Sequence, residues 1–263
     1  MKLIKIGGGK DINIKGIAED LSSINDNFIV ILGANYYRDN LAERLGIEIK
    51  RVTSISGQSS VYTDEVGIEL IKMAYAGLRS KQAVEIFQKH GLNAISLSGI
   101  DGGLIQGKRN QGVRIIENGK KKILHDLSGK PVNVNIDLLN MLIQAGYTPI
   151  ISIPILDEAN IAINTDNDAI IRILHSKFHF SEIYQFIEGE GIYRDYSDPS
   201  SFINELNSVQ LEELTNSMKG GIRRKLNEIK KLLQVNPTRV FVGDGRVSNP
   251  IKNLIDTKAT KIS

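Results

Sequence analysis

The sequence predicts an α/β fold, a three-layer αβα sandwich with a mainly parallel central sheet. Short apolar runs alternate with segments that repeat apolar residues at helical spacing, which is the rhythm of βαβ units. The run at residues 27–32 shows no polar alternation, as is typical of a parallel strand covered on both faces. The chain has 263 residues and is 41% hydrophobic, so it can bury one large core.

The first half of the chain contains seven expected elements: strand 2–6, helix 13–24, strand 27–32, helices 38–46, 65–79 and 81–91, and strand 93–99. The first helix carries Ile14, Ile17 and Leu21 at helical spacing. Gly46 and Gly91 stand where a left-handed residue closes a helix.

Residues 112–134 interrupt this alternation. Two β-rich arms flank Asn118 and Gly119, which tolerate the positive φ of a type I′ turn and therefore predict a hairpin. The elements expected after it are helix 135–146, strand 148–155, helix 168–178, apolar run 182–187, polar loop 196–201, basic helix 219–233 and a final strand 238–245. We expect the halves to be two lobes of one sandwich, with a hinge near residues 150–165.

The composition excludes several classes of site. The chain has no cysteine, which excludes disulfides, iron–sulfur clusters and thiolate zinc sites and favours a reducing compartment. The chain opens on a strand-like segment, and no stretch approaches the roughly 18 apolar residues of a membrane span. A net charge of +3 is too small to indicate a nucleic-acid binder. We expect a cytoplasmic protein without membrane or nucleic-acid partners.

Positive charge gathers in one segment, residues 107–130, where seven Lys or Arg stand against two acids. One interpretation is a solvated hairpin. The other is a docking surface for an acidic partner. The segment lacks the interleaved aromatic residues that stack on bases, which argues against single-stranded nucleic acid.

Glycines follow three of the expected strands, in "KIGGGKD", "LSGIDGG" and "VGDGR". Such turns let the backbone approach a phosphate and point N–H groups at it. The first turn lacks the third glycine of a dinucleotide fingerprint, and the second strand ends in "ILGAN" without the acid that would bind a ribose. No G-x-x-x-x-G-K-[ST] loop occurs either. A dehydrogenase is therefore disfavoured.

Lys5 lies inside the first expected strand, where an ammonium is unfavourable unless it finds a partner at the end of that strand. Phosphates beside the glycines would be such a partner, although the side chain would also be satisfied by reaching solvent. Asn164, Asp166 and Asp168 precede a helix, so one or two of them should be caps. They would also orient a lysine, because a carboxylate between two lysines fixes their positions and keeps both protonated.

Eight short motifs in this order resemble the amino acid kinase family. They are strand–Lys-x-Gly-Gly, strand–"LGAN"–helix, "SGxxSxYTD", "SGIDGGLIQGKR", the Asn-Gly hairpin, "AINTDNDA", "GGIRRKL" and "GDGRVSNPI". The match is closest to the acetylglutamate-kinase-like branch. Within that branch, it resembles the kinases of 2-aminoadipate or glutamate attached to a small acidic amino-group carrier protein. The resemblance covers essentially the whole chain.

The resemblance implies a role for each matching residue. Lys5 and Lys225 would stabilise the transferring phosphoryl group, and Asp168 would organise them. The implied nucleotide contacts are Lys5, Gly7, Gly8, Glu188, Gly191, Lys225 and Asp244. The implied acceptor contacts are Gly33, Ala34, Asn35, Ser60 and Asn164. We assign no metal ligand. The resemblance further implies ATP, Mg²⁺, an acyl-phosphate product, a homodimer, and one domain (1–263) with an acyl-acceptor-binding lobe (1–155) and a nucleotide-binding lobe (156–263).

Three positions depart from the pattern of the family. The His-Gly-Gly-Gly turn of the family is replaced here by Leu32, Gly33, Ala34 and Asn35. Val61 stands where the family has a substrate-binding arginine, so a carboxylate substrate loses its bidentate partner. Arg38, in the next helix, is a candidate replacement because it is near in sequence. "FIEGEG" replaces the usual Ser/Thr-Asp-Val, with Glu188 nearest to the expected acid.

These residues support one leading hypothesis and leave two others open. The leading one is ATP-dependent phosphorylation of the side-chain carboxylate of carrier-bound aminoadipate or glutamate in lysine or arginine biosynthesis, with the acidic carrier docking on the Lys108–Lys130 hairpin. The second is a kinase of N-acetylglutamate or another small N-acylated acid. The third is a catalytically weakened protein that binds nucleotide or metabolite as a regulator, although Lys5, Lys225 and Asp168 are retained.

Overall fold

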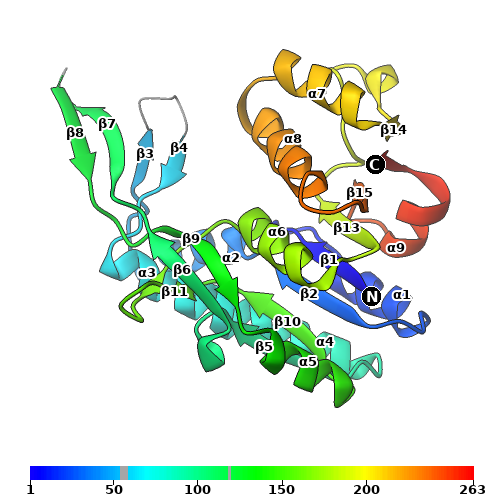
Figure 1. The fold of residues 1–263 in the computed structure, drawn as a ribbon, viewed down its shortest axis with the longest axis horizontal. Helices are drawn as coiled ribbons and strands as arrows, with labels where there is room; N and C mark the ends of the chain where they lie inside the picture. The colour runs from blue at the N-terminus through cyan, green and yellow to red at the C-terminus, as the bar shows by residue number, and fades with distance from the viewer. Residues whose placement is uncertain (54–58, 118–119) are drawn as a thin grey trace.

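The computed structural model describes residues 1–53, 59–117 and 120–263. An eight-stranded sheet runs through the middle of the molecule (Figure 1). Its strands, in spatial order, are β14 (Glu205–Leu206), β16 (Ala259–Ile262), β15 (Arg239–Asp244), β13 (Glu182–Ile187), β1 (Lys2–Ile6), β2 (Phe28–Leu32), β10 (Thr148–Ser152) and β5 (Ala94–Ser98). Every neighbouring pair is parallel except β15 with β16. The predicted fold class is therefore confirmed.

Helices connect the strands and cover both faces of the sheet (Figure 1). They are α1 (Ile14–Ser22), α2 (Asn35–Leu45), α3 (Glu65–Ile71), α4 (Ser80–Lys89), α5 (Ile136–Gln144), α6 (Asn167–Phe178), α7 (Ser208–Ser217), α8 (Gly220–Leu233) and the short α9 (Pro250–Lys252). Gly46 closes α2 with a φ of 67°, as its position in the sequence predicts. Among the described residues, none of the helices is both long and apolar enough to cross a lipid bilayer.

Alternate residues of each central strand face opposite helical layers, because side chains along a strand point to alternate faces. Leu3 and Ile183 pack into a core with residues of α6, α7 and α8. Ile4 and Phe186 pack into a second core with residues of α1, α4 and α9. These two cores explain why apolar residues occur on both faces of the central strands.

A second sheet of four short strands lies beside the first: β12 (Ala162–Ile163), β11 (Ile155–Leu156), β6 (Ile105–Arg109) and β9 (Gly129–Val134). Two hairpins project from the same side of the molecule, β3 (Arg51–Thr53) with β4 (Ser59–Val61), and β7 (Val113–Glu117) with β8 (Lys120–Leu124) (Figure 1). The β7–β8 hairpin is the predicted one, and its Asn118–Gly119 turn lies outside the described residues, as does Gly57.

Three expectations about the elements need correction. The segment 65–79 is α-helical only to Ile71 and continues as a π-helix over Lys72–Arg79, which apolar spacing does not distinguish from an α-helix. Strand β15 is not the last, because β16 follows it and pairs antiparallel to it. Helix α7 was not expected from the sequence. Strand β14 is so short that its sequence carries no usable periodicity.

Candidate functional site

Two glycine turns meet at the carboxyl ends of neighbouring strands β1 and β2. The Gly33 N–H donates to the Ile6 carbonyl at 2.9 Å, and the Tyr36 N–H donates to the Gly8 carbonyl at 2.9 Å. A Cβ at Gly8 would lie 2.6 Å from the Asn35 nitrogen, and a Cβ at Gly33 would lie 2.7 Å from the Gly8 nitrogen. Only glycine allows the two backbones to come this close.

Lys5 extends from β1 toward this edge of the sheet. Its ammonium forms an ion pair with Asp168 at the start of α6, and both side chains are largely buried, with exposed fractions of 14% and 20%. Asp166 caps the same helix by accepting from the Asp168 N–H at 3.1 Å. The expectation that Lys5 finds a partner at the end of its strand and that one acid acts as a cap is confirmed.

Lys225 reaches the same place from α8. The preceding residue, Arg224, pairs with Asp166 and so ties α8 to the beginning of α6. The pKa of Lys225 is lowered from 10.5 to about 8, mainly by burial and secondly by the positive charge of Lys5. The negative charges of Asp168 and Asp166 raise this pKa but do not compensate for the lowering. Lys225 therefore keeps its proton at neutral pH, as expected, but by a narrow margin.

Asp168 is held as a carboxylate. Burial raises its pKa, but the charges of Lys5, Lys225 and Arg224 outweigh burial and lower the pKa below its ordinary value. A carboxylate whose pKa is lowered by neighbouring cations is a poor proton acceptor and a good anchor for those cations. The structure thus brings together the three residues predicted to be catalytic. Sequence reasoning missed Arg224, although it lies in the quoted "GGIRRKL".

Asn164 joins three segments next to this cluster. Its amide donates to the Thr63 hydroxyl at 3.0 Å, and its backbone N–H donates to the Leu127 carbonyl at 2.7 Å. The Leu127 N–H in turn donates to the Thr63 carbonyl at 2.7 Å. The base of the β7–β8 hairpin is therefore bonded to both the start of α3 and the segment before α6. Thr63 was not predicted, although it lies in the motif "SGxxSxYTD".

The second glycine turn is anchored through Asn35. The Tyr75 hydroxyl donates to the Asn35 side-chain oxygen at 2.6 Å, and Arg38 Nη1 donates to the same oxygen at 3.2 Å. Burial is the main reason why the pKa of Tyr75 is raised to about 12, so the phenol remains a donor. Asn35 therefore has a structural role at this turn, in addition to the acceptor contact that the resemblance implies.

A cavity of about 220 Å³ lies beside this turn. We call it the Arg38 cavity. Its walls come from the first turn of α2, the segment between α2 and β3, the end of β4 and helix α3. They include Arg38, Glu48, Ile49, Lys50, Val61, Tyr62, Asp64 and Leu70. Val61 thus lines the same cavity as Arg38, the candidate replacement for the arginine that is absent at position 61. Ser60, predicted to contact the acceptor, is an exposed residue of β4 and does not line this cavity.

Two of the predicted nucleotide contacts, Glu188 and Asp244, lie at the carboxyl ends of β13 and β15. Glu188 accepts from the Asp11 N–H at 2.7 Å, and its carboxylate fills the space beside Gly9 in the first glycine turn. Asp244 accepts from the backbone and guanidinium of Arg246 at 2.7–2.8 Å, and these bonds are the main cause of its lowered pKa. Gly191 lies elsewhere, against Thr260, whose hydroxyl accepts from the Ile192 N–H at 2.8 Å.

The site fits a nucleotide better than a metal ion held by protein ligands. The touching glycine turns and the two lysines suit phosphate oxygens. Within the described ranges, no three His, Asp or Glu side chains gather closely enough to hold a metal ion. A Mg²⁺ ion would therefore take most of its ligands from the nucleotide phosphates and water, as this ion commonly does.

Known proteins resemble this chain over its full length. The LysW-aminoadipate kinase of Thermus thermophilus is 34% identical over 268 residues, which covers 100% of both chains. The LysW-aminoadipate kinase of Deinococcus radiodurans is 32% identical over 100% of this chain and 91% of its own. The LysW-aminoadipate/LysW-glutamate kinase of Saccharolobus solfataricus is 29% identical over 100% of this chain and 99% of its own.

Solved structures share the fold at lower identity. The N-acetylglutamate synthase of Neisseria gonorrhoeae superimposes with a TM-score of 0.78 at 17% identity, over 100% of this chain and 59% of the synthase. The isopentenyl phosphate kinase of T. acidophilum gives 0.64 at 16% identity, over 100% of both chains. The sequence profile of the amino acid kinase family matches residues 1–244. The chain therefore belongs to the amino acid kinase family and is an ATP-dependent phosphotransferase.

Proposed function

We propose that this kinase phosphorylates the side-chain carboxylate of 2-aminoadipate or glutamate attached to an acidic amino-group carrier protein, as a step of lysine or arginine biosynthesis. The names of the three relatives described above support this acceptor. The observation that carries the chemistry is the cluster of Lys5, Asp168 and Lys225 at the edge of the two glycine turns.

In the proposed reaction, a carboxylate oxygen of the acceptor attacks the γ-phosphorus of ATP. A new P–O bond forms, the bond to the β,γ-bridging oxygen breaks, and the products are an acyl phosphate and ADP. The acceptor carboxylate is already ionised at neutral pH, so no side chain needs to remove a proton. This agrees with the lowered pKa of Asp168, which would position cations rather than act as a base.

The lysines supply the charge that this transfer requires. Negative charge spreads over the oxygens of the moving phosphoryl group, and preorganised cations stabilise it. Lys5 would approach from the β1 side and Lys225 from α8, with Asp168 between them. The Gly8 N–H would contact the phosphates, whereas the Gly7 N–H already donates to the Phe186 carbonyl at 3.0 Å. We assign residues 1–155 to acceptor binding and 156–263 to nucleotide binding, with Glu188, Gly191 and Asp244 on the nucleotide side.

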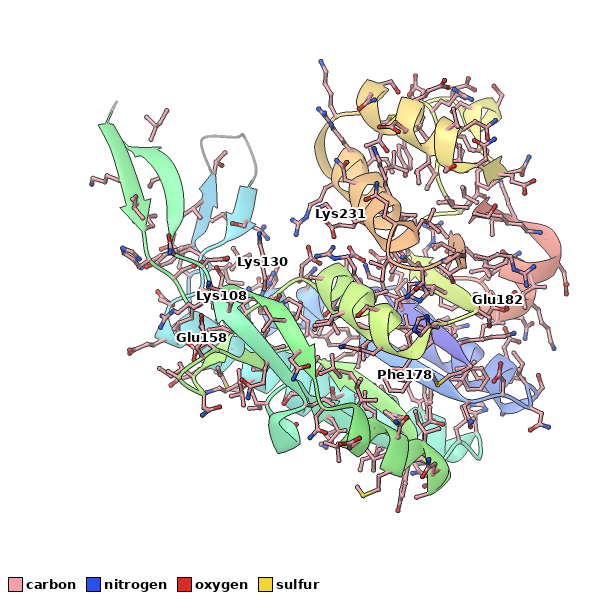
Figure 2. All side chains as sticks on the ribbon, in the orientation of Figure 1. Lys108, Lys130, Glu158, Phe178, Glu182 and Lys231 are labelled. Atoms are coloured by element: carbon pink, nitrogen blue, oxygen red, sulfur yellow. The ribbon has the colours of Figure 1, made fainter. Side chains whose placement is uncertain are left out.

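The carrier would dock on the Lys108–Lys130 hairpin. Lys108 and Lys130 face each other in the register of β6 and β9, at the base of the projecting hairpin (Figure 2). Ile116 and Ile123 are 60% and 57% exposed on the hairpin itself. A basic surface with exposed apolar side chains suits an acidic protein partner, because charge speeds the encounter and apolar contact prolongs the complex.

A phosphorylation assay tests the function. Carrier-linked aminoadipate, carrier-linked glutamate and free N-acetylglutamate are each incubated with labelled ATP, using the wild type and Lys225→Ala. We expect acyl phosphate from a carrier-linked acceptor, and at least ~100-fold less from the variant. Preference for free N-acetylglutamate would favour the alternative acceptor. No turnover with any acceptor, together with retained nucleotide binding, would favour the regulator.

Charge reversal tests the docking surface. The test variant carries glutamate at Lys120, Lys121 and Lys122. The structure does not describe the side chains of Lys120 and Lys121. We expect a higher KM for the carrier-linked acceptor and an altered salt dependence, because the long-range attraction is lost. The matched control reverses three exposed lysines elsewhere, Lys15, Lys89 and Lys177. Equal KM values in the two triple variants would exclude docking on the hairpin.

We also propose a homodimer. Four large apolar side chains on α2, α3 and the π-helical segment are exposed in the single chain: Leu45, Val66, Met73 and Leu78. Exposed apolar groups of this kind are typical of surfaces that another protein covers. Light scattering of the purified chain, compared with Met73→Glu, measures the mass directly. A monomeric wild type at micromolar concentration would contradict the proposal.

A further inference from the structure

The Arg38 cavity has a buried cation in its wall. Arg38 lies on its wall with a side chain only 7% exposed. Its Nε and Nη2 donate to Asp39 Oδ1 at 2.8 and 2.6 Å, and its Nη1 donates to Asn35 at 3.2 Å. A guanidinium has five N–H groups, so two of them remain for a ligand. The existing bonds hold the group in one orientation.

The charged groups around Arg38 largely balance one another. Asp39 is shared by Arg38 and by Arg51 of β3, whose nearest nitrogen is 3.6 Å from Asp39 Oδ2. These three groups sum to one net positive charge. Lys50 and Asp64, 4.0 Å apart on the same cavity wall, offset each other. Glu48, an exposed residue of the same wall, adds one negative charge, so the charged groups balance overall. An acidic ligand would therefore be held by the oriented N–H groups of Arg38 and not by a net charge of the wall.

The cavity connects to the transfer site through one residue. The side-chain oxygen of Asn35 accepts a hydrogen bond from Arg38. The backbone of Asn35 lies against Gly8, so closely that a Cβ built at Gly8 would be 2.6 Å from the Asn35 nitrogen. A ligand in the cavity thus lies next to the glycine turns. At about 220 Å³, the space is smaller than the roughly 300–1,000 Å³ of pockets for drug-sized molecules, and it suits a small acid.

The rest of the wall suits a short carbon chain. Ile49, Val61 and Leu70 supply apolar surface. An arginine at Val61 would add a second guanidinium to the wall that already carries Arg38. The two positions are therefore alternatives for placing one carboxylate-binding group in the same cavity.

We infer that Arg38 recognises the non-reacting carboxylate of a short dicarboxylic acceptor and takes the place of the arginine that is absent at Val61. This inference rests on the proposed function, since it names the residue that selects the same acceptor. The guanidinium binds one carboxylate by its two remaining N–H groups, Val61 contacts the carbon chain, and the other carboxylate extends toward the glycine turns. Arg38 thereby determines that the acceptor is a dicarboxylate.

Three variants test the assignment. In Arg38→Met, the KM for the carrier-linked acceptor should rise about 10- to 100-fold, as for a lost charged hydrogen-bonding partner, while the KM for ATP changes less than about 2-fold. Arg38→Lys should restore part of the affinity, because it keeps the charge but not the bidentate geometry. Adding Val61→Arg to Arg38→Met should restore more, because it returns a guanidinium to the cavity.

Arg44→Met is the matched control, since Arg44 is an exposed arginine near the other end of the same helix. It should leave both KM values unchanged. Thermal melting and the KM for ATP show whether each variant is folded. An Arg38→Met enzyme with an unchanged KM for the acceptor overturns the inference. A rise in both KM values without rescue by Val61→Arg also overturns it, because Arg38 would then only support the glycine turn.

Failure of the proposed function gives a different result. If the wild type phosphorylates none of the acceptors, calorimetry with glutarate, a five-carbon dicarboxylate, still measures the cavity. Binding that Arg38→Met weakens at least about 10-fold supports the inference although the reaction is another one. Equal glutarate binding by wild type and Arg38→Met, or none by either, overturns it.

Discussion

Replacing Lys225 with methionine should stabilise the ligand-free protein while it abolishes phosphoryl transfer. Burial and the charge of Lys5 lower the pKa of Lys225 from 10.5 to about 8. At about 1.4 kcal/mol for each tenfold change in the proton equilibrium, this difference corresponds to roughly 3 kcal/mol of unfavourable free energy for the charged form. Methionine keeps most of the apolar stem and removes the charge.

We expect a gain of about 1–3 kcal/mol in the free energy of unfolding at pH 7, which is roughly 2–10 °C in Tm for a chain of this length. The folded chain binds the Lys225 proton more weakly than the unfolded chain does. The destabilisation of the folded state by the charged Lys225 is therefore complete below about pH 8. It disappears as the pH rises toward 10.5, the ordinary pKa of lysine. The Tm difference between variant and wild type should accordingly shrink from pH 7 to pH 9.5.

Melting curves at both pH values measure this difference, and a phosphorylation assay measures the loss of transfer. Lys231→Met is the control, because Lys231 lies on the same helix with a side chain 54% exposed (Figure 2). It should change the Tm little, since exposed ion pairs contribute little to stability. A Lys225→Met protein that is less stable than wild type at pH 7, or a difference independent of pH, would refute the argument from burial.

Three further predictions concern the same site and the core. Lys5→Met should lower kcat about 100- to 1,000-fold in a steady-state assay, because it removes a cation from the transferring group; a kcat within tenfold of wild type would contradict that role. Gly8→Ala should lower the Tm and raise the KM for ATP, because the new Cβ would lie 2.6 Å from the Asn35 nitrogen; an unchanged KM would place the phosphates elsewhere. His175 is fully buried between the Phe180 N–H and the Asn236 carbonyl, and burial lowers its pKa from 6.5. Its neutral form stabilises the fold above pH 6.5, and this contribution is lost as the pH falls. The free energy of unfolding of His175→Leu, measured with denaturant, should therefore change less between pH 7 and pH 5 than that of the wild type. An equal change in the two proteins would show that another group titrates.

The sequence was most informative where a local pattern has one physical meaning. An apolar run such as residues 28–32 fits only a strand covered on both faces, and a glycine such as Gly46 at the end of a helical pattern fits a left-handed cap. A lysine inside a buried strand requires a partner, and Asp168 is that partner. The order of eight short motifs was enough to indicate the family, because each motif keeps its own place along the chain.

Elements without such a pattern could not be predicted. The π-helix over Lys72–Arg79 has the same apolar composition as an α-helix, and only its backbone hydrogen bonds distinguish it. Strands β14 and β16 are two and four residues long and gain their stability from strands distant in sequence. Their pairing is a tertiary contact, so no local signal announces it.

The sequence by itself determined the αβα fold, the two glycine turns and the residue types of the transfer site. Only the tertiary structure decided how these residues influence one another. The lowered pKa of Lys225 arises from burial and from Lys5, 220 positions away in the chain. The shared cavity of Arg38 and Val61 exists because α2, the end of β4 and α3 lie around one space. Charge interactions and cavities depend on distance in space, and a linear sequence does not contain that distance until the chain has folded.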